Sequence, residues 1–233
     1  MLKKITLALM IGALSNSAFA IKALEDLRAE AETKDGWRLA KYDRRHNIKA
    51  YVKNEDGKSI RSFKVEALFD YPIDVVARLQ SDVDNYKRWY FEVLESKLLK
   101  KVSDKEFIFY LVHNAPVGMA DRDVVMKATI EPMTSKKPYV IIKMVSLRDY
   151  LPTQKPYERM ETEDYIIKLT PQGDNQTLLE SEGYIDPGAG APSWAVNFIQ
   201  GKAPYTNMMG MRRMMAMPQY QDKKAPITFT FFE

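Results

Sequence analysis

Short apolar runs alternate with turn-forming residues between residues 92 and 186. Six runs follow one another, each bounded by Gly, Pro, Asn or Asp: VLESKLLKKV, EFIFYLVHN, RDVVMKATIEP, PYVIIKMVSL, ERMETEDYIIKLTP and NQTLLESEGYID. Short apolar runs between such turn signals predict strands. No segment between two runs is long enough for a crossover helix, so neighbouring strands are expected to pair antiparallel.

Two earlier runs predict a hairpin. IKAYV (residues 48–52) and SFKVEALF (residues 62–69) are separated by the turn-rich sequence NEDGKS. With these two, the sequence predicts about eight or nine strands. Runs such as FIFYLV and YVIIKMV are apolar at successive positions. Both faces of the sheet are therefore expected to be covered.

Three segments predict helices. The first is an amphipathic helix from Ala23 to about Tyr42, and the second, PIDVVARLQSDVDNYKRWY (residues 72–90), is one helix or two short ones. A long helix follows the loop DPGAGAP (residues 186–192) and runs to about Met215. Steps of three or four along it align Trp194, Phe198, Gly201, Tyr205, Met208, Met209 and Arg212. The fold class is α+β, in which a curved antiparallel sheet wraps the long C-terminal helix and buries the apolar surface of both.

The first twenty residues, MLKKITLALMIGALSNSAFA, have the organisation of a secretory signal. Lys3 and Lys4 form a basic start, an apolar core follows, and Ala18-Phe19-Ala20 is a small-x-small cleavage site. The apolar core is about half of the roughly 20 residues that span a bilayer, so a retained membrane anchor is the weaker interpretation. We expect residues 1–20 to be removed and residues 21–233 to form a single domain in an exported compartment, most simply a bacterial periplasm.

Composition narrows the range of functions. The chain contains no Cys, which excludes disulfides, a thiolate nucleophile and Cys-based metal sites. Loss of Lys3 and Lys4 with the signal lowers the formal net charge from +4 to +2. This near balance gives no support to nucleic-acid binding. Weak attraction of basic patches such as KYDRR (residues 41–45) to anionic lipid headgroups stays open.

Catalytic and metal-binding patterns are sparse. The two histidines, His46 and His113, are too isolated for a His-rich metal centre, and no G-x-S-x-G, H-E-x-x-H or P-loop motif occurs. His113 in YLVHNAP is the one candidate general base, although a hydrogen-bonded histidine at a strand end explains it better. The Met-rich MGMRRMMAM could supply soft ligands to Cu(I), but its helical spacing favours core packing. We expect no cofactor.

Five segments, in order and spacing, resemble the START (steroidogenic acute regulatory protein-related lipid transfer) domain family: GWRLAKYDRRHNIKAYVK, PIDVVARLQSDVDNYKRWY, PVGMADRDVV, YERMETEDYII and DPGAGAPSWAVNFIQGKAPYTNMMGMRR. The resemblance covers residues 36 to about 215. It implies a helix-grip fold that encloses an apolar tunnel for one lipid, such as a phospholipid or a sterol-like molecule. A monomer that touches membranes transiently is the expected form.

Candidate ligand-binding residues come from the segments that carry the resemblance. The long helix offers Trp194, Asn197, Phe198, Tyr205, Met208 and Met209, and the strand segments offer Arg122, Arg159, Glu161 and Tyr184. Methionine is unbranched and polarizable, so a Met-rich helix face can repack around different acyl chains. The alternative for the charged residues, including Asp123 beside Arg122, is a structural one: ion pairs that fasten strand ends and loops.

The long helix is also the candidate gate of the tunnel. Gly201 and Pro204 weaken its hydrogen-bond ladder, and the DPGAGAP loop would be the hinge. The competing gate is the loop NAPVGMADRD (residues 114–123). Three functional classes stay open: a lipid carrier or lipid-binding protein, an enzyme that acts on a hydrophobic substrate in the same cavity, and a lipid-sensing interaction module. The first is the expected one.

Overall fold

The computed structural model describes residues 35–116, 118–188 and 190–233 and places ten strands of this part of the chain in one sheet. The strands are β1 (Arg38–Asp43), β2 (Ile48–Lys53), β3 (Ser62–Phe69), β4 (Val93–Lys101), β5 (Glu106–His113), β6 (Arg122–Glu131), β7 (Val140–Ser146), β8 (Glu158–Arg159), β9 (Thr162–Pro171) and β10 (Thr177–Asp186). The helical segments are α2 (Ile73–Ser81), the 3-10 helix η1 (Val83–Arg88), α3 (Ser193–Met215) and α4 (Pro218–Gln221). The expected α+β class is confirmed.

The sheet runs in the order β1-β2-β3-β10-β9-β7-β6-β5-β4. Every neighbouring pair along this path is antiparallel, as the short connections predict. Only β8 differs among the described strands: it has two residues and pairs with β6 in parallel. The pairing of β3 with β10 joins the N-terminal strands to the rest of the sheet.

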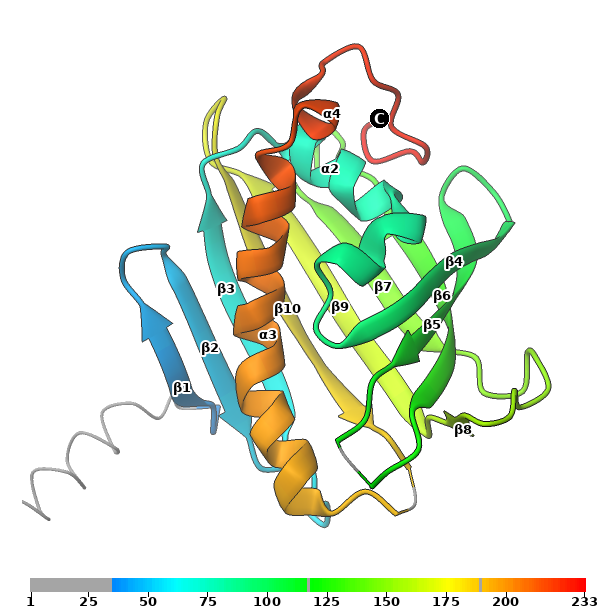
Figure 1. The fold of residues 1–233 in the computed structure, drawn as a ribbon. Helices are drawn as coiled ribbons and strands as arrows, with labels where there is room; N and C mark the ends of the chain where they lie inside the picture. Colours follow the sequence, from blue (N-terminus) through cyan, green and yellow to red (C-terminus); the bar gives the residue numbers. More distant parts are fainter. Residues whose placement is uncertain (1–34, 117, 189) are drawn as a thin grey trace, which may run out of the picture.

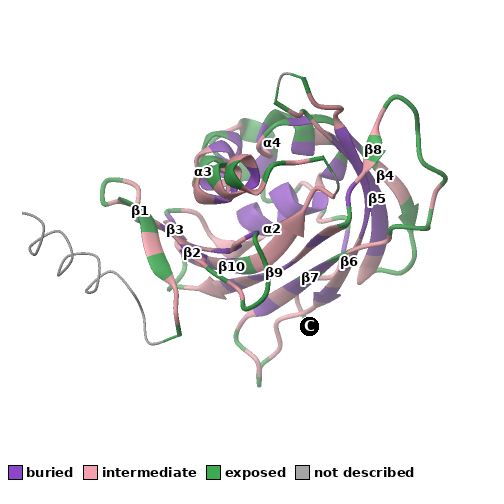
Figure 2. Cartoon of the chain, turned by 90° about the horizontal axis from the view of Figure 1, so that it is seen from below, coloured by how far each residue is buried: buried purple, intermediate pink, exposed green. Residues whose placement is uncertain are grey.

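The sheet curves around the long helix α3. Figure 1 shows α3 running along the sheet, with α2 and α4 near one end of it. Seen from below, α3 and α2 lie within the curve that the strands form (Figure 2). Buried side chains of α2, α3 and the concave strand faces form one hydrophobic cluster. The predicted grip of a curved antiparallel sheet on the C-terminal helix is confirmed.

Both faces of β5 are covered, and by different elements. Phe107, Phe109 and Leu111 point into the main cluster on the concave side. The intervening Ile108, Tyr110 and Val112 point to the convex side and form a second cluster. Leu147, Leu151 and Tyr157, from the segment between β7 and β8, pack against this second cluster. The continuous apolar run FIFYLV is explained by a helix on one side and a loop on the other.

Two predictions about the elements need correction. Residues 38–42 belong to the edge strand β1 and not to an N-terminal helix, because their backbone pairs with β2 from Arg38 opposite Val52 to Asp43 opposite Ile48. Long-range pairing here overrides the local helical pattern. The part of that predicted helix before residue 35, and the signal at residues 1–20, lie outside the described residues. The sheet has ten strands in place of the expected eight or nine, because β1 was assigned to a helix and the predicted run from Glu158 to Pro171 is divided into β8 and β9.

The segment predicted as one helix or two is two, since α2 ends at Ser81 and η1 begins at Val83. Helix α3 contains Pro204, which cannot donate a backbone hydrogen bond to the preceding turn. Gly210 allows its C-terminal half to approach η1 closely: a Cβ atom there would lie 2.4 Å from the carbonyl oxygen of Trp89. No helix among the described residues has the length and apolarity needed to cross a membrane.

Candidate functional site

A cavity of about 160 Å³ lies between α3 and the concave face of the sheet. Its wall is mainly apolar. From the sheet it includes Phe63, Val65, Tyr165, Ile167, Leu179 and Ile185. From α3 it includes Ala195, Val196, Ile199, Gln200, Ala203, Pro204, Asn207, Met208 and Met211. Asn114, Ala115 and Pro116, together with Pro187 and Ala191 before α3, also contribute to the wall, which places one end of the cavity beside the N-terminus of α3.

The face of α3 that lines the cavity is not the predicted one. Trp194 and Phe198 are 76% and 59% exposed, so the prediction that they line the tunnel is wrong. The neighbouring positions Val196, Ile199 and Gln200 face the cavity instead. Apolar and small residues occur all around α3, so helical spacing alone does not identify the buried side. Packing against the sheet selects it.

The other predicted residues of α3 divide between cavity and surface. Met208 lines the cavity and is 5% exposed. Asn197 accepts a hydrogen bond from the backbone amide of Arg61 (2.8 Å) and donates one to the carbonyl of Ser59 (2.9 Å), so it fastens α3 to the β2–β3 connection. The Tyr205 hydroxyl donates to Asp43 (2.8 Å). Tyr205 and Met209 pack against the main cluster, and neither they nor Asn197 belong to the cavity wall.

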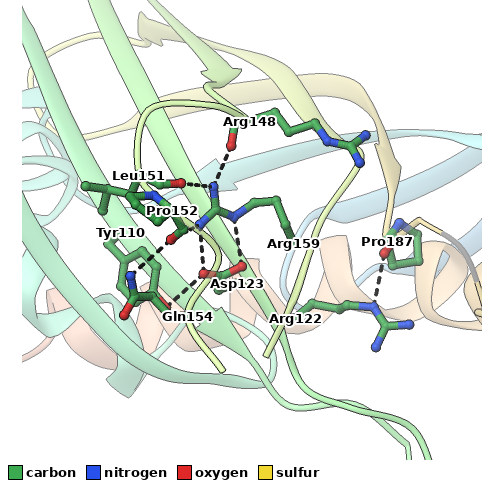
Figure 3. Close-up of polar contacts among 9 residues, drawn as sticks. All are labelled: Tyr110, Arg122, Asp123, Arg148, Leu151, Pro152, Gln154, Arg159 and Pro187. Atoms are coloured by element: carbon green, nitrogen blue, oxygen red, sulfur yellow. Dashed lines mark hydrogen bonds and ion pairs between the residues drawn. The ribbon is translucent and has the colours of Figure 1, made fainter. Parts of the chain in front are cut away.

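Arg122 lies in the cavity wall and also joins three segments at the end of the cavity. Its Nε donates to the carbonyl of Pro187 (3.0 Å; Figure 3), and its Nη1 donates to the carbonyl of Ala120. Its Nη2 lies 3.0 Å from Oε2 of Glu158 on β8. The loop before β6, the loop before α3 and β8 are therefore held by one guanidinium.

Arg159 points away from the cavity. Its guanidinium binds the carboxylate of Asp123 and donates to the carbonyl of Leu151 (3.0 Å), beside Tyr110 on the convex side of the sheet (Figure 3). Burial, followed by the charge of Asp123, raises the pKa of Tyr110 above its ordinary value. The hydrogen bond from Tyr110 to Asp123 (3.1 Å) is thus made by a neutral phenol. The structural alternative for Arg159 and Asp123, an ion pair that fastens a loop, is the one that this geometry supports.

Glu161 and Tyr184 also lie outside the cavity wall. Glu161 pairs with Arg148, and both side chains are about half exposed. The ring of Tyr184 lies under the ammonium of Lys58, 3.9 Å from the ring centroid. On β10 the cavity is lined by Leu179, Ser181 and Ile185, and Tyr184 has the opposite parity. Glu161 and Tyr184 were predicted to bind ligand because they lie in segments that resemble the family. That choice took no account of the direction in which each side chain points.

A buried polar cluster in the cavity wall was missed by the sequence analysis. Glu163 on β9 is fully buried, its Oε1 accepts a hydrogen bond from the Tyr90 hydroxyl (2.9 Å), and its Oε2 lies 3.0 Å from Nε2 of His113. Burial, followed by the charge of Glu163, raises the pKa of Tyr90 well above its ordinary value and also raises that of Tyr165. Glu163 lies two positions before Tyr165 on β9, so both side chains point to the same, buried face of the sheet. This alternation is the sequence signal that could have identified Glu163 as a residue of the cavity wall.

The close approach of two backbones positions Tyr165 in this cluster. Tyr165 pairs with Gly183 across β9 and β10, and a Cβ atom on Gly183 would lie 2.3 Å from the Cβ of Tyr165. Only glycine at position 183 leaves room for the side chain of Tyr165 on the neighbouring strand. Among the described residues, no group of three or more His, Asp or Glu side chains could hold a metal ion.

Comparison with known proteins places this architecture in a family. A family model described as the START domain matches residues 20–224. An uncharacterized protein of Pseudomonas aeruginosa is 25% identical over 178 residues, which are 76% of this chain and 86% of the relative. Human START domain-containing protein 10 is 22% identical over 204 residues, which are 85% of this chain and 68% of the relative.

A solved structure is also similar. The crystal structure of the STAR-related lipid transfer protein from Xanthomonas axonopodis superposes with a TM-score of 0.72 at 28% identity, covering 78% of this chain and all of that one. With the family model matching well over half of the sequence, the chain belongs to the START domain family.

Proposed function

We propose that the protein binds one lipid molecule in the cavity between α3 and the sheet and transfers it between membranes. The observation that carries the proposal is the apolar cavity itself, which is enclosed on one side by the sheet and on the other by α3. Each buried methylene gains about 0.8 kcal/mol, so a lipid leaves a bilayer readily only for a comparable apolar environment. The similar protein from Xanthomonas axonopodis is described as a lipid transfer protein.

A lipid must enlarge this cavity in order to enter. The present volume of about 160 Å³ is below the roughly 300–1,000 Å³ of typical ligand pockets. We propose that the N-terminal half of α3 moves outward. A Cβ atom on Gly201 would meet nothing within 4 Å, whereas the helix at Gly210 is in close contact with Trp89. Pro204 lies between these two regions and interrupts the hydrogen-bond ladder.

The outward residues Trp194 and Phe198 are assigned to membrane contact. They are the most exposed large hydrophobic side chains of α3, and they lie at the end of the helix where the cavity is lined by loops. The ammonium of Lys202 lies 4.0 Å from the centroid of the Phe198 ring. An aromatic pair beside a cation suits the interface of an anionic membrane, where rings reach the acyl boundary and the cation meets headgroups.

In the proposed function the cavity carries a lipid and catalyses no reaction. Residues 21–233 act alone, in an exported compartment. The alternatives are an enzyme acting on a hydrophobic substrate in the same cavity and a lipid-sensing module. Turnover of a cavity-bound lipid would establish the first, and a partner that binds only the loaded protein would establish the second. Intact-mass analysis tests export, since the exported protein should begin at Ile21.

The proposed function is tested by obstructing the cavity. Ala203 lines the cavity from α3, and Thr206, in the following turn, is exposed. Ala203→Phe should reduce the transfer of a fluorescent phospholipid between donor and acceptor vesicles, because the added ring occupies the cavity. Thr206→Phe adds the same ring outside and should leave transfer unchanged. Equal transfer by both variants and the unsubstituted protein, with their folding verified by circular dichroism, would rule out this cavity as the carrier site.

A further inference from the structure

The polar side chains of the cavity wall differ in whether all their polar atoms form hydrogen bonds. The side chain of Gln200 donates to the carbonyl of Ile185 (2.8 Å), and the side-chain oxygen of Asn207 accepts a bond from the backbone amide of Phe91 (2.6 Å). Glu163 differs from these amides. Its Oε1 is bonded to Tyr90, but its Oε2 has no hydrogen-bond partner among the described residues.

His113 is the second group in this cluster with an atom that makes no hydrogen bond to the described residues. Its Nε2 lies 3.0 Å from Oε2 of Glu163, yet the two atoms are not aligned as in a hydrogen bond, and Nε2 forms none with the described residues. The ring is held edge-on by Tyr90, with 5.8 Å between the centroids. The side chain of Glu163 is fully buried, whereas that of His113 is 17% exposed. An acceptor and an imidazole nitrogen thus lie next to each other in an otherwise apolar wall.

Two buried polar atoms without hydrogen bonds lower the stability of the folded protein unless a ligand or another group binds them. A buried polar atom without a hydrogen bond destabilises the folded state by about 1–3 kcal/mol, and more if it is charged. The other inward positions of β9 near the cavity, Tyr165 and Ile167, carry the large apolar bodies that suit this environment. A carboxylate at position 163 is therefore costly unless a donor also reaches Oε2 with hydrogen-bond geometry.

We propose that Glu163 and His113 form the polar end of the cavity and bind a lipid hydroxyl, which donates to Oε2 of Glu163 and accepts from Nε2 of His113. This inference rests on the proposed function and names the chemical class of the ligand, an alcohol on an apolar body. A hydroxyl both donates and accepts, so it can satisfy both atoms. An ammonium donates only, and a carboxylate or phosphate would meet Glu163 as a like charge.

Tyr90 is the positioning residue. Its hydroxyl donates to Oε1 of Glu163, which leaves Oε2 as the oxygen available to the ligand. Because burial and the charge of Glu163 raise the pKa of Tyr90, the phenol stays a donor at neutral pH. The carboxylate is thereby held in one orientation before the ligand arrives.

The experiment compares matched single-chain probes on protein freed of co-purified lipid. Dodecanol, dodecyl methyl ether and dodecylamine share one chain and differ at the polar end, and their affinities are measured by displacement of a fluorescent fatty probe. The unsubstituted protein should bind the alcohol more tightly than the ether and the amine. Glu163→Gln should reduce the alcohol's advantage over the ether by about tenfold or more, because a hydrogen bond to a charged group is lost. Ether binding itself should not change.

Glu161→Gln is the matched control, since Glu161 lies two positions earlier and outside the cavity wall. It should keep the full preference for the alcohol. His113→Phe, which retains a ring against Tyr90, should also reduce the preference and provides a second route if Glu163→Gln does not fold. The inference is overturned by an unchanged alcohol-to-ether ratio in Glu163→Gln and His113→Phe, by no such preference in the unsubstituted protein, or by tighter binding of the amine. Binding of none of the probes would overturn the proposed function itself, together with this inference.

Discussion

Arg159 binds Asp123 through two bonds, Nε to Oδ1 at 2.8 Å and Nη2 to Oδ2 at 3.0 Å, on the side of the sheet opposite the cavity. Both side chains are buried, with 6% and 0% of their surface exposed. Arg159 also donates to the carbonyls of Leu151 and Pro152. The pair therefore fixes the loop that covers the convex cluster of β5 and β6.

Replacement of Arg159 should strongly destabilise the fold. Arg159→Met leaves the buried carboxylate of Asp123 without its partner, and the free energy of unfolding should fall by about 3–5 kcal/mol in urea denaturation. Arg148→Met removes an exposed partner of Glu161 and should cost less than about 1 kcal/mol. Similar losses for the two variants would contradict the assignment of Arg159 as a structural anchor.

Truncation of the outward aromatics should separate membrane contact from stability. Trp194→Ala and Phe198→Ala should each change the free energy of unfolding by less than about 1 kcal/mol, because both rings are exposed. Association with anionic vesicles, measured by co-sedimentation, should weaken in both. Val196→Ala removes a buried cavity residue from the same helix and should cost about 1–3 kcal/mol while vesicle association persists. Undiminished vesicle binding by both aromatic variants would exclude this surface.

A disulfide across the gate should trap the ligand. The side chain of Asn197 contacts the backbone of Ser59, and the chain has no cysteine of its own. In Ser59→Cys/Asn197→Cys, oxidation should stop the exchange of a bound fluorescent lipid, and reduction should restore it. Each single-cysteine variant should exchange alike in both conditions. If the oxidised double variant exchanges as fast as the reduced one, the opening belongs to the loop at residues 114–123.

The contact of Asp43 with α3 should depend on acidity. Hydrogen bonds from His46 and then from Tyr205 lower the pKa of Asp43 from 3.8 to about 2. A group whose pKa is depressed by folding stabilises the folded state above its unfolded pKa, and this contribution is lost as the pH falls through the folded value. Asp43→Asn should therefore lower the midpoint temperature at pH 5–7, and the difference from the unsubstituted protein should vanish near pH 2.

The exposed Asp104 provides the control for this pH dependence. Its pKa is also lowered, chiefly by its bond to Lys101, but its side chain is 73% exposed and this partner belongs to β4 and not to α3. Asp104→Asn should shift the midpoint temperature little at any pH. A difference for Asp43→Asn that stays constant from pH 7 to pH 2 would mean that its carboxylate charge does not hold α3.

Local patterns were sufficient for most of the fold. Short apolar runs between turn signals located β2 to β7, β9 and β10, since a strand that is covered on one or both faces needs apolar side chains whatever its partners are. Short connections made the sheet antiparallel. The long α3 also follows from local spacing, whereas the break between α2 and η1 does not, because the sequence left one helix or two short ones open for residues 72–90. The edge strand β1 could not be predicted from local patterns, because only its pairing with β2 makes it a strand.

The cavity-facing residues could be predicted only in part. Met208 and Arg122, two of the candidate ligand-binding residues, lie in the cavity wall, whereas Trp194 and Phe198 were placed on the wrong side of α3. Helical spacing groups residues by face but does not say which face meets the sheet when small and apolar residues surround the helix. That choice is made by packing, which the close approach of Gly210 to Trp89 fixes.

By itself, the sequence determined that an antiparallel sheet grips a Met-rich C-terminal helix, because strand parity and helical period are properties of neighbouring residues. Only the tertiary structure decided that Glu163 on β9, His113 at the end of β5 and Tyr90 after η1 meet in one wall. These residues lie 23 to 73 positions apart, and no local period relates them. Their meeting depends on the order and register of strands, which backbone pairing over the whole sheet sets.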